Sequence, residues 1–463
     1  MILSPMNRIT IRTKAAISCL LQQSRYFSSS APNPHASLRG QNSVQLLPSY
    51  LRDSRSIQKY HPIQAPNGAI ALSVAENPMV EEMITSECNQ FIPSGDVDTN
   101  GTNSTMPSDQ IYYQPTQGRA DVILTMSKFL QGILKLNRPL DTDGIVLGAG
   151  CNAVLENLVF CLTELGDGIL IPTPYYAAFE FDLVARIGVN VIPVTTMDYS
   201  SGDATSPEAY YPTIKAIEAA CELAKAQGIT PKALLLSHPQ NPLGICYPKH
   251  IIQDCIDYCR KNEIHLISDE IYAASVYDTT FQSVLQIAKE ENEDLGPFVH
   301  FVYALSKDFA MSGLRVGVSY TENKDIRYPL QKLNDLCQIS SQTQVFVHNM
   351  LSHPTFSSSF LQRHAQLLQN RSKKLQSFLH KHNIPFLTPT AGFFLWMDLS
   401  QFHTEEHALY LELMKEYGLI FTPGESMKSE RSMFFRFVFC AVKDEEFDLA
   451  LERFYKFIKD KRA

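Results

Sequence analysis

A single lysine follows a strongly apolar run in this sequence. Lys307 comes just after residues 298–305, a run typical of a buried strand. Burial makes a charged ammonium costly unless the group is neutralised or chemically converted. A Schiff base between the lysine amine and an aldehyde cofactor meets this condition, because the charge becomes delocalised and paired. The alternative is a lysine whose stem is covered while its ammonium reaches water.

A second strand-like run, residues 265–268, leads into Asp269. An aspartate here could simply cap the following helix. Its functional interpretation is an ion pair with a protonated pyridine nitrogen, which keeps the ring able to accept electrons from a substrate α-carbon. Tyr272 and Asn241 could donate to the phenolate oxygen of that ring, although an Asn-Pro pair could also be a plain turn. These side chains predict pyridoxal 5'-phosphate (PLP) as the cofactor, held on Lys307.

A glycine-containing segment before an expected helix could bind the cofactor phosphate. Gly148-Ala149-Gly150 precedes a helix expected from Asn152, and free N–H groups at a helix N-terminus bind anions. Arg315 could pair with the same phosphate, and Tyr176 could stack on the ring. The predicted cofactor-binding residues are Lys307, Gly150, Cys151, Asn152, Tyr176, Asn241, Asp269, Tyr272, Ser306 and Arg315.

An arginine interrupts another apolar run, residues 434–439. A guanidinium in such a run needs a partner or a ligand. The α-carboxylate of a substrate, held by two parallel hydrogen bonds from Arg436, fits this need. A structural salt bridge to an acidic residue is the alternative.

The elements that must position these residues alternate between strand-like and helix-like patterns from about residue 144. This alternation predicts an α/β fold with a mostly parallel sheet and helices on both faces, and with the active site at the carboxyl ends of the strands. One helix is expected from Pro207 to about Gln227. The region before Tyr112 is expected to form an arm and loops. The tail after Phe346 is expected to be mainly helical, with two short strand-like pieces.

The composition is that of an ordinary globular protein. The chain has 463 residues, of which 44% are hydrophobic and 19% are charged, and its formal net charge is -8. This acidic balance argues against nucleic-acid binding, and no apolar run is long enough to span a bilayer. The 10 cysteines are scattered without a CxxC pair or zinc-ligand spacing. That usage favours buried reduced thiols and no metal site.

The N-terminal stretch differs from the rest of the chain. No acidic residue precedes Asp53, whereas arginines and serines are frequent there. This composition is typical of a mitochondrial transit peptide, and Arg25-Tyr26-Phe27-Ser28 resembles a matrix-protease cleavage site. We therefore expect a location in the mitochondrial matrix. The alternative is a disordered extension without an address, in a cytoplasmic protein.

The motifs that carry a family resemblance occur in order along most of the chain. They are Ala75-Glu76-Asn77, Pro172-Thr173-Pro174-Tyr175-Tyr176, Asn241-Pro242-Leu243-Gly244, Ser268-Asp269-Glu270-Ile271-Tyr272, Ser306-Lys307-Asp308 with Arg315, Ala391-Gly392-Phe393, and Arg436. Together they resemble the fold-type I PLP enzymes of aminotransferase class I/II. Within that group the chain is most similar to the 1-aminocyclopropane-1-carboxylate (ACC) synthase-like branch.

The resemblance implies a PLP-transferase fold of type I. Its large domain has three αβα layers and holds PLP, and a smaller α+β domain is built from both chain ends. It also implies a homodimer with active sites at the subunit interface. The expected organisation is an extension (1–50), an arm with part of the small domain (51–110), the large domain (111–340) and the rest of the small domain (341–463).

The resemblance also implies substrate-binding roles. Asn77 and Arg436 would lie near the substrate carboxylate. Glu76 would be the residue that favours the cationic S-adenosylmethionine in ACC synthases. Two positions depart from the family pattern. Ala304 replaces a serine that usually touches the phosphate, and Thr116 replaces a tyrosine that ACC synthases carry.

The reaction itself stays open at this level. Lys307, Asp269 and Tyr272 are the predicted catalytic residues, and the lysine amine would remove the α-proton. Because Glu76 is present, we favour α,γ-elimination and ring closure of S-adenosylmethionine. Transamination between an amino acid and a keto acid is the alternative, followed by carbon–sulfur lysis. A catalytically silent PLP-fold binding protein is the remaining hypothesis, and the intact set of site residues argues against it.

Overall fold

A computed structural model describes residues 37, 42–43, 45–92, 110–196, 203–288 and 294–463 of the chain. Ser43–Ala463 forms one compact unit, and Met1–Asn42 is a separate one. The predicted transit peptide with Arg25-Tyr26-Phe27-Ser28 lies outside the described residues. In the part that the structure describes, no helix has the length and apolar character needed to cross a membrane.

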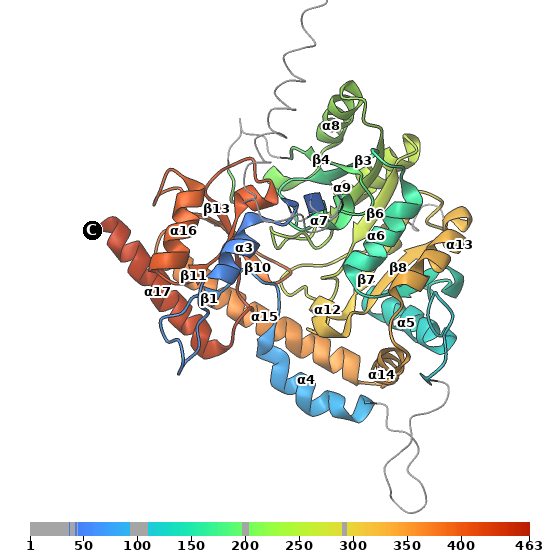
Figure 1. Cartoon of the computed structure of the whole chain (residues 1–463), viewed down its shortest axis with the longest axis horizontal. Helices are drawn as coiled ribbons and strands as arrows, with labels where there is room; N and C mark the ends of the chain where they lie inside the picture. The colour runs from blue at the N-terminus through green and yellow to red at the C-terminus, as the bar shows by residue number, and fades with distance from the viewer. Residues whose placement is uncertain (1–36, 38–41, 44, 93–109, 197–202, 289–293) are drawn as a thin grey trace, which may run out of the picture. The chain divides into compact units, whose positions relative to one another are not determined.

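A seven-stranded sheet forms the centre of the larger part of the second unit (Figure 1). Its strands are β2 (Ile145–Gly148), β3 (Gly168–Pro172), β4 (Asn190–Val194), β5 (Pro231–Ser237), β6 (His265–Asp269), β7 (Val299–Ala304) and β8 (Gly317–Thr321). The order is β2-β8-β7-β6-β5-β3-β4. Only β8 runs antiparallel to its neighbours, β2 and β7. The predicted mostly parallel sheet is therefore confirmed.

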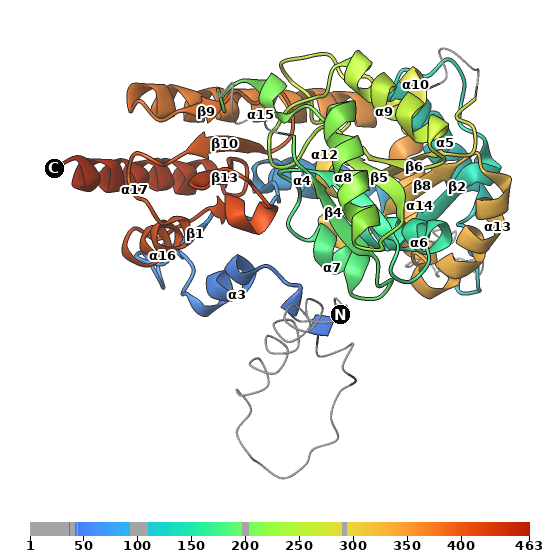
Figure 2. The same ribbon diagram turned by 90° about the horizontal axis from the view of Figure 1, so that it is seen from above.

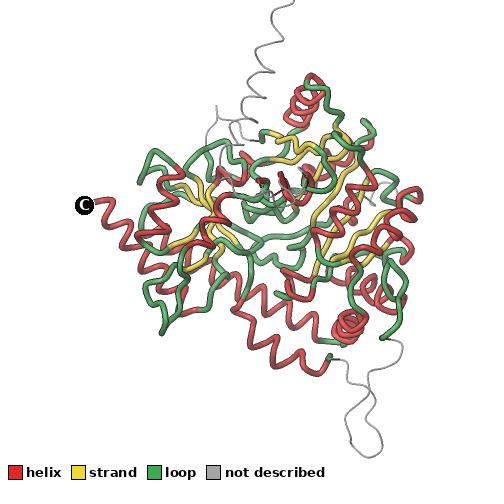
Figure 3. The backbone as a smooth tube through the Cα atoms, in the orientation of Figure 1, coloured by secondary structure: helices red, strands yellow, loops and turns green. Residues whose placement is uncertain are grey.

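Helices cover both faces of this sheet, which gives three layers (Figure 3). They are α5 (Ala120–Ile133), α6 (Cys151–Leu162), α7 (Phe179–Val184), α8 (Ile214–Ala226), α9 (Lys249–Lys261), α10 (Val284–Ile287), α12 (Leu305–Asp308), α13 (Lys324–Leu333) and α14 (Ser341–Ser352). Residues 233–236 of strand β5 show why the middle of this strand is apolar. Leu234 and Leu236 pack with α8 and α9, whereas Ala233 and Leu235 pack with α6 on the opposite face. Successive side chains of a strand point to opposite faces of the sheet. Where helices cover both faces, the residues facing each side are apolar, and the strand becomes a continuous apolar run.

The helix expected from Pro207 begins later than predicted. Residues Pro207–Tyr210 form a short 3-10 turn, and the helix proper is α8, from Ile214. Pro212 causes the break, because the residue before a proline is pushed towards extended conformation, and Tyr211 has ψ 130°. Thr213 then caps α8 by accepting a hydrogen bond from the amide of Ala216 at 3.2 Å.

Both ends of the second unit contribute to the smaller part, as Figure 2 shows. Its antiparallel sheet has the order β12-β13-β10-β9. The strands are β9 (Phe386–Leu387), β10 (Phe394–Asp398), β12 (Thr422–Pro423) and β13 (Phe434–Val438), and the helices are α15 (Phe356–Lys381), α16 (Glu406–Glu416) and α17 (Asp444–Arg462). From the N-terminal side, β1 (Ile70–Ala71) pairs with β11 (Leu419–Ile420). The two predicted strand-like pieces correspond to β10 and β13.

The region before Tyr112 has more structure than the expected arm and loops. It contains helices α3 (Ser49–Ser56) and α4 (Glu81–Glu87). Asn77 starts the turn that leads into α4, since its side chain accepts a hydrogen bond from the amide of Met79 at 3.2 Å. Acidic residues in the first turn, as in α4, complement the helix dipole.

Candidate active site

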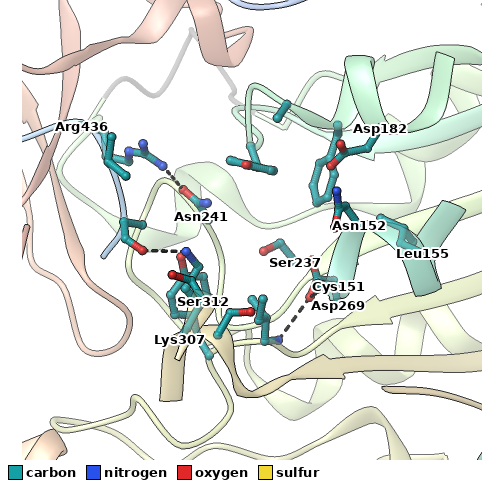
Figure 4. A pocket seen from close by; sticks show the side chains of 18 of the residues that line it. Cys151, Asn152, Leu155, Asp182, Ser237, Asn241, Asp269, Lys307, Ser312 and Arg436 are labelled. Carbon is teal, nitrogen blue, oxygen red and sulfur yellow. Dashed lines mark hydrogen bonds between the residues drawn. The ribbon is translucent and has the colours of Figure 1, made fainter. Parts of the chain in front are cut away.

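The carboxyl ends of the central strands surround a cavity of about 300 Å³. Lys307 lies in α12 directly after β7, Asp269 ends β6, and Asn241 follows β5. Figure 4 shows their side chains pointing toward the same space. The predicted residues that line the cavity are Cys151, Asn152, Tyr176, Asn241, Asp269, Tyr272, Ser306, Lys307, Arg315 and Arg436. The topology explains this convergence, because parallel strands end at one edge of the sheet.

The amine of Lys307 is held inside this cavity. Its Nζ donates a hydrogen bond to the carbonyl oxygen of Ala75 at 2.6 Å. Burial is the main cause that lowers the pKa of this amine from its ordinary value. A lowered pKa leaves a larger fraction of the amine unprotonated near neutral pH, and only the unprotonated amine acts as a nucleophile or a base. Lys307 as a whole is half-buried, and its side chain lines the cavity.

Asp269 is a buried carboxylate on the same wall. Its Oδ1 accepts a hydrogen bond from the amide of Ile271 at 3.2 Å and lies 3.6 Å from the Sγ of Cys151. Burial raises the pKa of Asp269 to about 6, although these hydrogen bonds oppose the change. A cation placed beside the carboxylate would favour its ionised form. The site therefore suits a protonated ring nitrogen.

The start of α6 and Arg315 form an anion-binding corner. Helix α6 has Gly150 as its N-cap, with φ 95° and no hydrogen bond from a capping side chain. The Nη2 of Arg315 donates to the Oδ1 of Asn152 at 2.8 Å, and its Nη1 donates to the carbonyl of Ser312 at 3.1 Å. A Cβ at position 150 would lie 2.3 Å from that Nη2, so only glycine lets the guanidinium approach. Uncapped amides next to a guanidinium fit a phosphate group.

Arg436 reaches the cavity from the middle of β13, in the smaller sheet. Its side chain is buried, and its Nη1 donates to the Oδ1 of Asn241 at 2.8 Å. Its Nη2 donates to the carbonyl of Ser73 at 2.7 Å and to the Oγ1 of Thr422 at 3.1 Å. All three partners are neutral oxygens, so these contacts are not the salt bridge of the alternative interpretation. The Nε of Arg436 and the Nδ2 of Asn77 are both buried without a hydrogen-bond partner among the described residues, and two such donors suit a carboxylate.

The aromatic residues of the predicted site are fixed by packing. Tyr272 is buried and contacts Phe393 and Phe394 edge to face, each with ring centroids 5.2 Å apart. Tyr176 contacts Phe179 in the same manner at 5.3 Å. Rings that are held in this way keep one orientation toward the cavity.

Three predicted residues do not line the cavity wall itself. They are Gly150, Glu76 and Asn77. Glu76 is linked to the wall by Ser312, whose Oγ donates to its Oε1 at 3.1 Å. Its backbone carbonyl accepts a contact from the Sγ of Cys440 at 3.3 Å.

Sequence reasoning missed several wall residues. They are Tyr50, Leu51, Ser73, Val74, Ala75, Leu155, Ala178, Phe179, Asp182, Ser237, Ile271 and Ser312. Asp182 is the notable case, because burial raises its pKa to about 7. It lies within the amphipathic run that forms α7, so its sequence context suggests only a solvated helix face. Ala304, where the family usually has a serine, is fully buried in β7.

Comparisons with known proteins show which family the sequence matches. Residues 104–454 match the model of aminotransferase class I and II. The chain is 33% identical over 412 residues to 1-aminocyclopropane-1-carboxylate synthase 2 of Solanum lycopersicum, covering 86% of this chain and 82% of that protein. It is 32% identical over 418 residues to 1-aminocyclopropane-1-carboxylate synthase of Nicotiana tabacum, covering 87% and 82%.

Solved structures show the same fold. The aspartate aminotransferase from Thermus thermophilus with maleate has a TM-score of 0.69 at 20% identity, covering 92% of this chain and 100% of that one. An aminotransferase from Staphylococcus aureus has a TM-score of 0.70 at 20% identity, covering 90% and 99%.

Proposed function

Because the chain belongs to the aminotransferase class I and II family, a family of PLP-dependent enzymes, we propose that it forms ACC from S-adenosylmethionine. The observation that carries this choice among the family's reactions is the carboxylate of Glu76. The Oγ of Ser312, a residue of the cavity wall, donates a hydrogen bond to the Oε1 of Glu76 at 3.1 Å. This bond holds the carboxylate beside the cavity, where it can attract a cationic sulfonium group. The similarity to ACC synthases over most of the chain supports the same choice.

The side chains divide the work as follows. PLP, when bound, supplies an electrophilic aldehyde and an electron-accepting ring. The Nζ of Lys307 removes the proton from the substrate α-carbon. Asp269 holds a proton at the ring nitrogen, and Tyr272 donates to the ring oxygen. Asn241 is oriented for the same contact, because Arg436 occupies its Oδ1 and so turns its Nδ2 toward the cavity.

The remaining groups bind and orient. The amides at the start of α6 and the guanidinium of Arg315 bind the phosphate. Arg436 binds the α-carboxylate of the substrate, and its Nε is otherwise unpaired among the described residues. Asn77 follows the wall residue Ala75 by two positions, and its unpaired Nδ2 is the second donor for this carboxylate once the substrate is bound. Tyr176, on the cavity wall, would cover the face of the ring. Binding at both ends fixes the α-carbon beside Lys307, so that the proton transfer occurs within one complex.

Glu76→Gln is the sharpest test of the substrate. The change keeps size and removes the negative charge, so we expect KM for S-adenosylmethionine to rise about tenfold, equivalent to about 1.4 kcal/mol. Neutral amino acids should bind with little change. Initial rates with mass-spectrometric detection of ACC measure the effect. Glu82→Gln, an exposed acid in α4, is the matched control, and equal losses for cationic and neutral substrates would separate Glu76 from substrate choice.

Arg436→Ala is expected to weaken substrate binding by about 2–5 kcal/mol, because a buried carboxylate loses its partner. Spectral titration of the PLP-loaded protein with the amino acid measures this affinity. Arg453→Ala is a control, since that guanidinium binds the carbonyls of Gly68 and Gly418 away from the cavity. An unchanged affinity in Arg436→Ala would place the carboxylate elsewhere.

Transamination is the second candidate. Thr116 stands where ACC synthases carry a tyrosine, and every wall residue needed for removal of the α-proton also serves a transaminase. The enzyme should be incubated with S-adenosylmethionine and, separately, with panels of amino acids and keto acids. Formation of ACC supports the first proposal. A keto acid as sole product would replace it by transamination, and a released thiol by carbon–sulfur lysis.

We also propose a homodimer in the mitochondrial matrix. Ile111, Tyr112 and Tyr113 are 61%, 68% and 101% exposed, and consecutive exposed apolar residues favour an interface. Sedimentation of the purified protein at the mass of one chain would exclude the dimer.

The acid-free N-terminal stretch supports the proposed location in the mitochondrial matrix. Failure of isolated mitochondria to import the full chain would exclude this location.

A further inference from the structure

A buried acid follows Lys307 in the chain and has no part in the proposed chemistry. Asp308 is fully buried, although an ionised carboxylate without partners is among the most costly groups to bury. We propose that Asp308 is a positioning residue, which fixes the Lys307 amine relative to Asp269 and Tyr272 by joining the two turns that carry them.

Three donors converge on this carboxylate. Its Oδ2 accepts hydrogen bonds from the amide of Ala274 at 2.9 Å and from the hydroxyl of Tyr303 at 3.0 Å. Its Oδ1 accepts a hydrogen bond from the hydroxyl of Ser275 at 2.6 Å. Burial raises the pKa of Asp308 to about 7, although these hydrogen bonds oppose the change. Three donors on its two oxygens fix the position of the Asp308 carboxyl group.

The donors belong to the elements that carry the site. Ala274 and Ser275 are in the turn after Tyr272, where the amide of Ser275 donates to the carbonyl of Tyr272 at 2.9 Å. Tyr303 is in β7, the strand that leads into α12. Asp308 therefore ties the turn after β6 to the turn after β7. The Asp269–Tyr272 stretch and Lys307 come from those same two turns.

Asp308 acts from behind the site and not within it. In a helical turn, consecutive side chains point in directions about 100° apart, and Lys307 lines the cavity whereas Asp308 does not. A role through the backbone follows, and it differs from the catalytic role of Lys307. Asparagine at this position would place an amide N–H group against donors, leaving one of them unpaired.

The test compares Asp308→Asn with Glu406→Gln in the PLP-loaded enzyme. Glu406 is also a buried acid that accepts hydrogen bonds from backbone amides, those of Glu425 and Met433, but it lies in the smaller part of the fold. Three quantities are measured for each variant. They are the pH midpoint of the bound cofactor's visible absorption band, kcat and KM for S-adenosylmethionine, and the unfolding temperature.

We expect both variants to unfold at lower temperature. Only Asp308→Asn should shift the absorption midpoint, because that midpoint reports the environment of the lysine-linked nitrogen. Its kcat should fall by about tenfold, whereas its KM should stay nearly unchanged. A displacement of about 1 Å can lower the rate by roughly 10²-fold, and the displacement expected here is smaller. An unaltered midpoint and kcat in a folded Asp308→Asn would overturn the proposal.

Two milder variants decide the case if Asp308→Asn does not fold. Tyr303→Phe and Ser275→Ala each remove one donor and leave the carboxylate in place, so each should shift the midpoint in the same direction by less. If the absorption midpoint is unchanged in both Tyr303→Phe and Ser275→Ala, the positioning role is overturned. The inference rests on the proposed PLP site but not on the reaction. A wild-type protein that shows the absorption band but forms no ACC would refute only the reaction, whereas absence of the band would remove the site.

Discussion

Replacing Lys307 by alanine is expected to abolish both turnover and the yellow colour of the PLP-loaded protein. The amine is the group that would link to the cofactor aldehyde and then move the α-proton. Loss of a general base alone costs roughly 10²–10⁴-fold, and the lost link adds to this cost. Absorption spectra and initial rates of the purified variant measure both effects.

The control for this variant is Lys324→Ala, an exposed lysine at the start of α13. It should keep the colour and the activity of the wild type. Borohydride reduction followed by peptide mass spectrometry gives an independent measurement, since it should add the cofactor mass to the peptide that contains Lys307. A wild-type protein that stays colourless in excess PLP, or a label on another lysine, would refute the assignment and favour a silent binding protein.

The core of this site could be predicted from sequence because each residue follows a short apolar run. Asp269 is the last residue of β6, and Lys307 and Asn241 come shortly after β7 and β5. Parallel strands end at one edge of the sheet. A local pattern is then enough to bring distant residues together. Arg315 joins them at that edge because it precedes β8, which runs antiparallel to β7.

Residues contributed by other elements could not be predicted in this way. Asp182 lies on the short helix α7. Ser312 lies in a short turn, and a small polar residue in a turn does not indicate a place in an active site. Tyr50 comes from α3, in a region expected to be an arm with loops. Their places on the wall depend on how separate elements pack, which neither periodicity nor spacing encodes. The polarity of Arg436 within an apolar run predicts a role in the site, but it does not predict that the side chain enters from a second sheet.

Asp269→Asn should bind PLP poorly and lose at least about 10²–10³-fold in kcat, the range that follows loss of one preorganised electrostatic contact. Asparagine preserves the shape of the side chain but cannot neutralise a protonated ring nitrogen. The electron-accepting capacity of the ring falls when that nitrogen loses its proton. Asp269→Ala, which also removes the packing atoms, should lose at least as much. Turnover near that of the wild type in either variant would refute the role of the carboxylate.

The pH dependence of PLP affinity provides a second measurement on the same residue. Burial raises the pKa of Asp269 to about 6, so the carboxylate is mainly ionised above that pH and mainly protonated below it. Only the ionised form attracts a cationic ring, and the affinity of the wild type should therefore fall as the pH drops below about 6. Asp269→Asn has no such proton to gain, and its weaker affinity should lack this step. Asp335→Asn, at an exposed acid after α13, should follow the wild type. A step that persists in Asp269→Asn would assign the titration to another group in the cavity, with Asp182 the first candidate because burial raises its pKa to about 7.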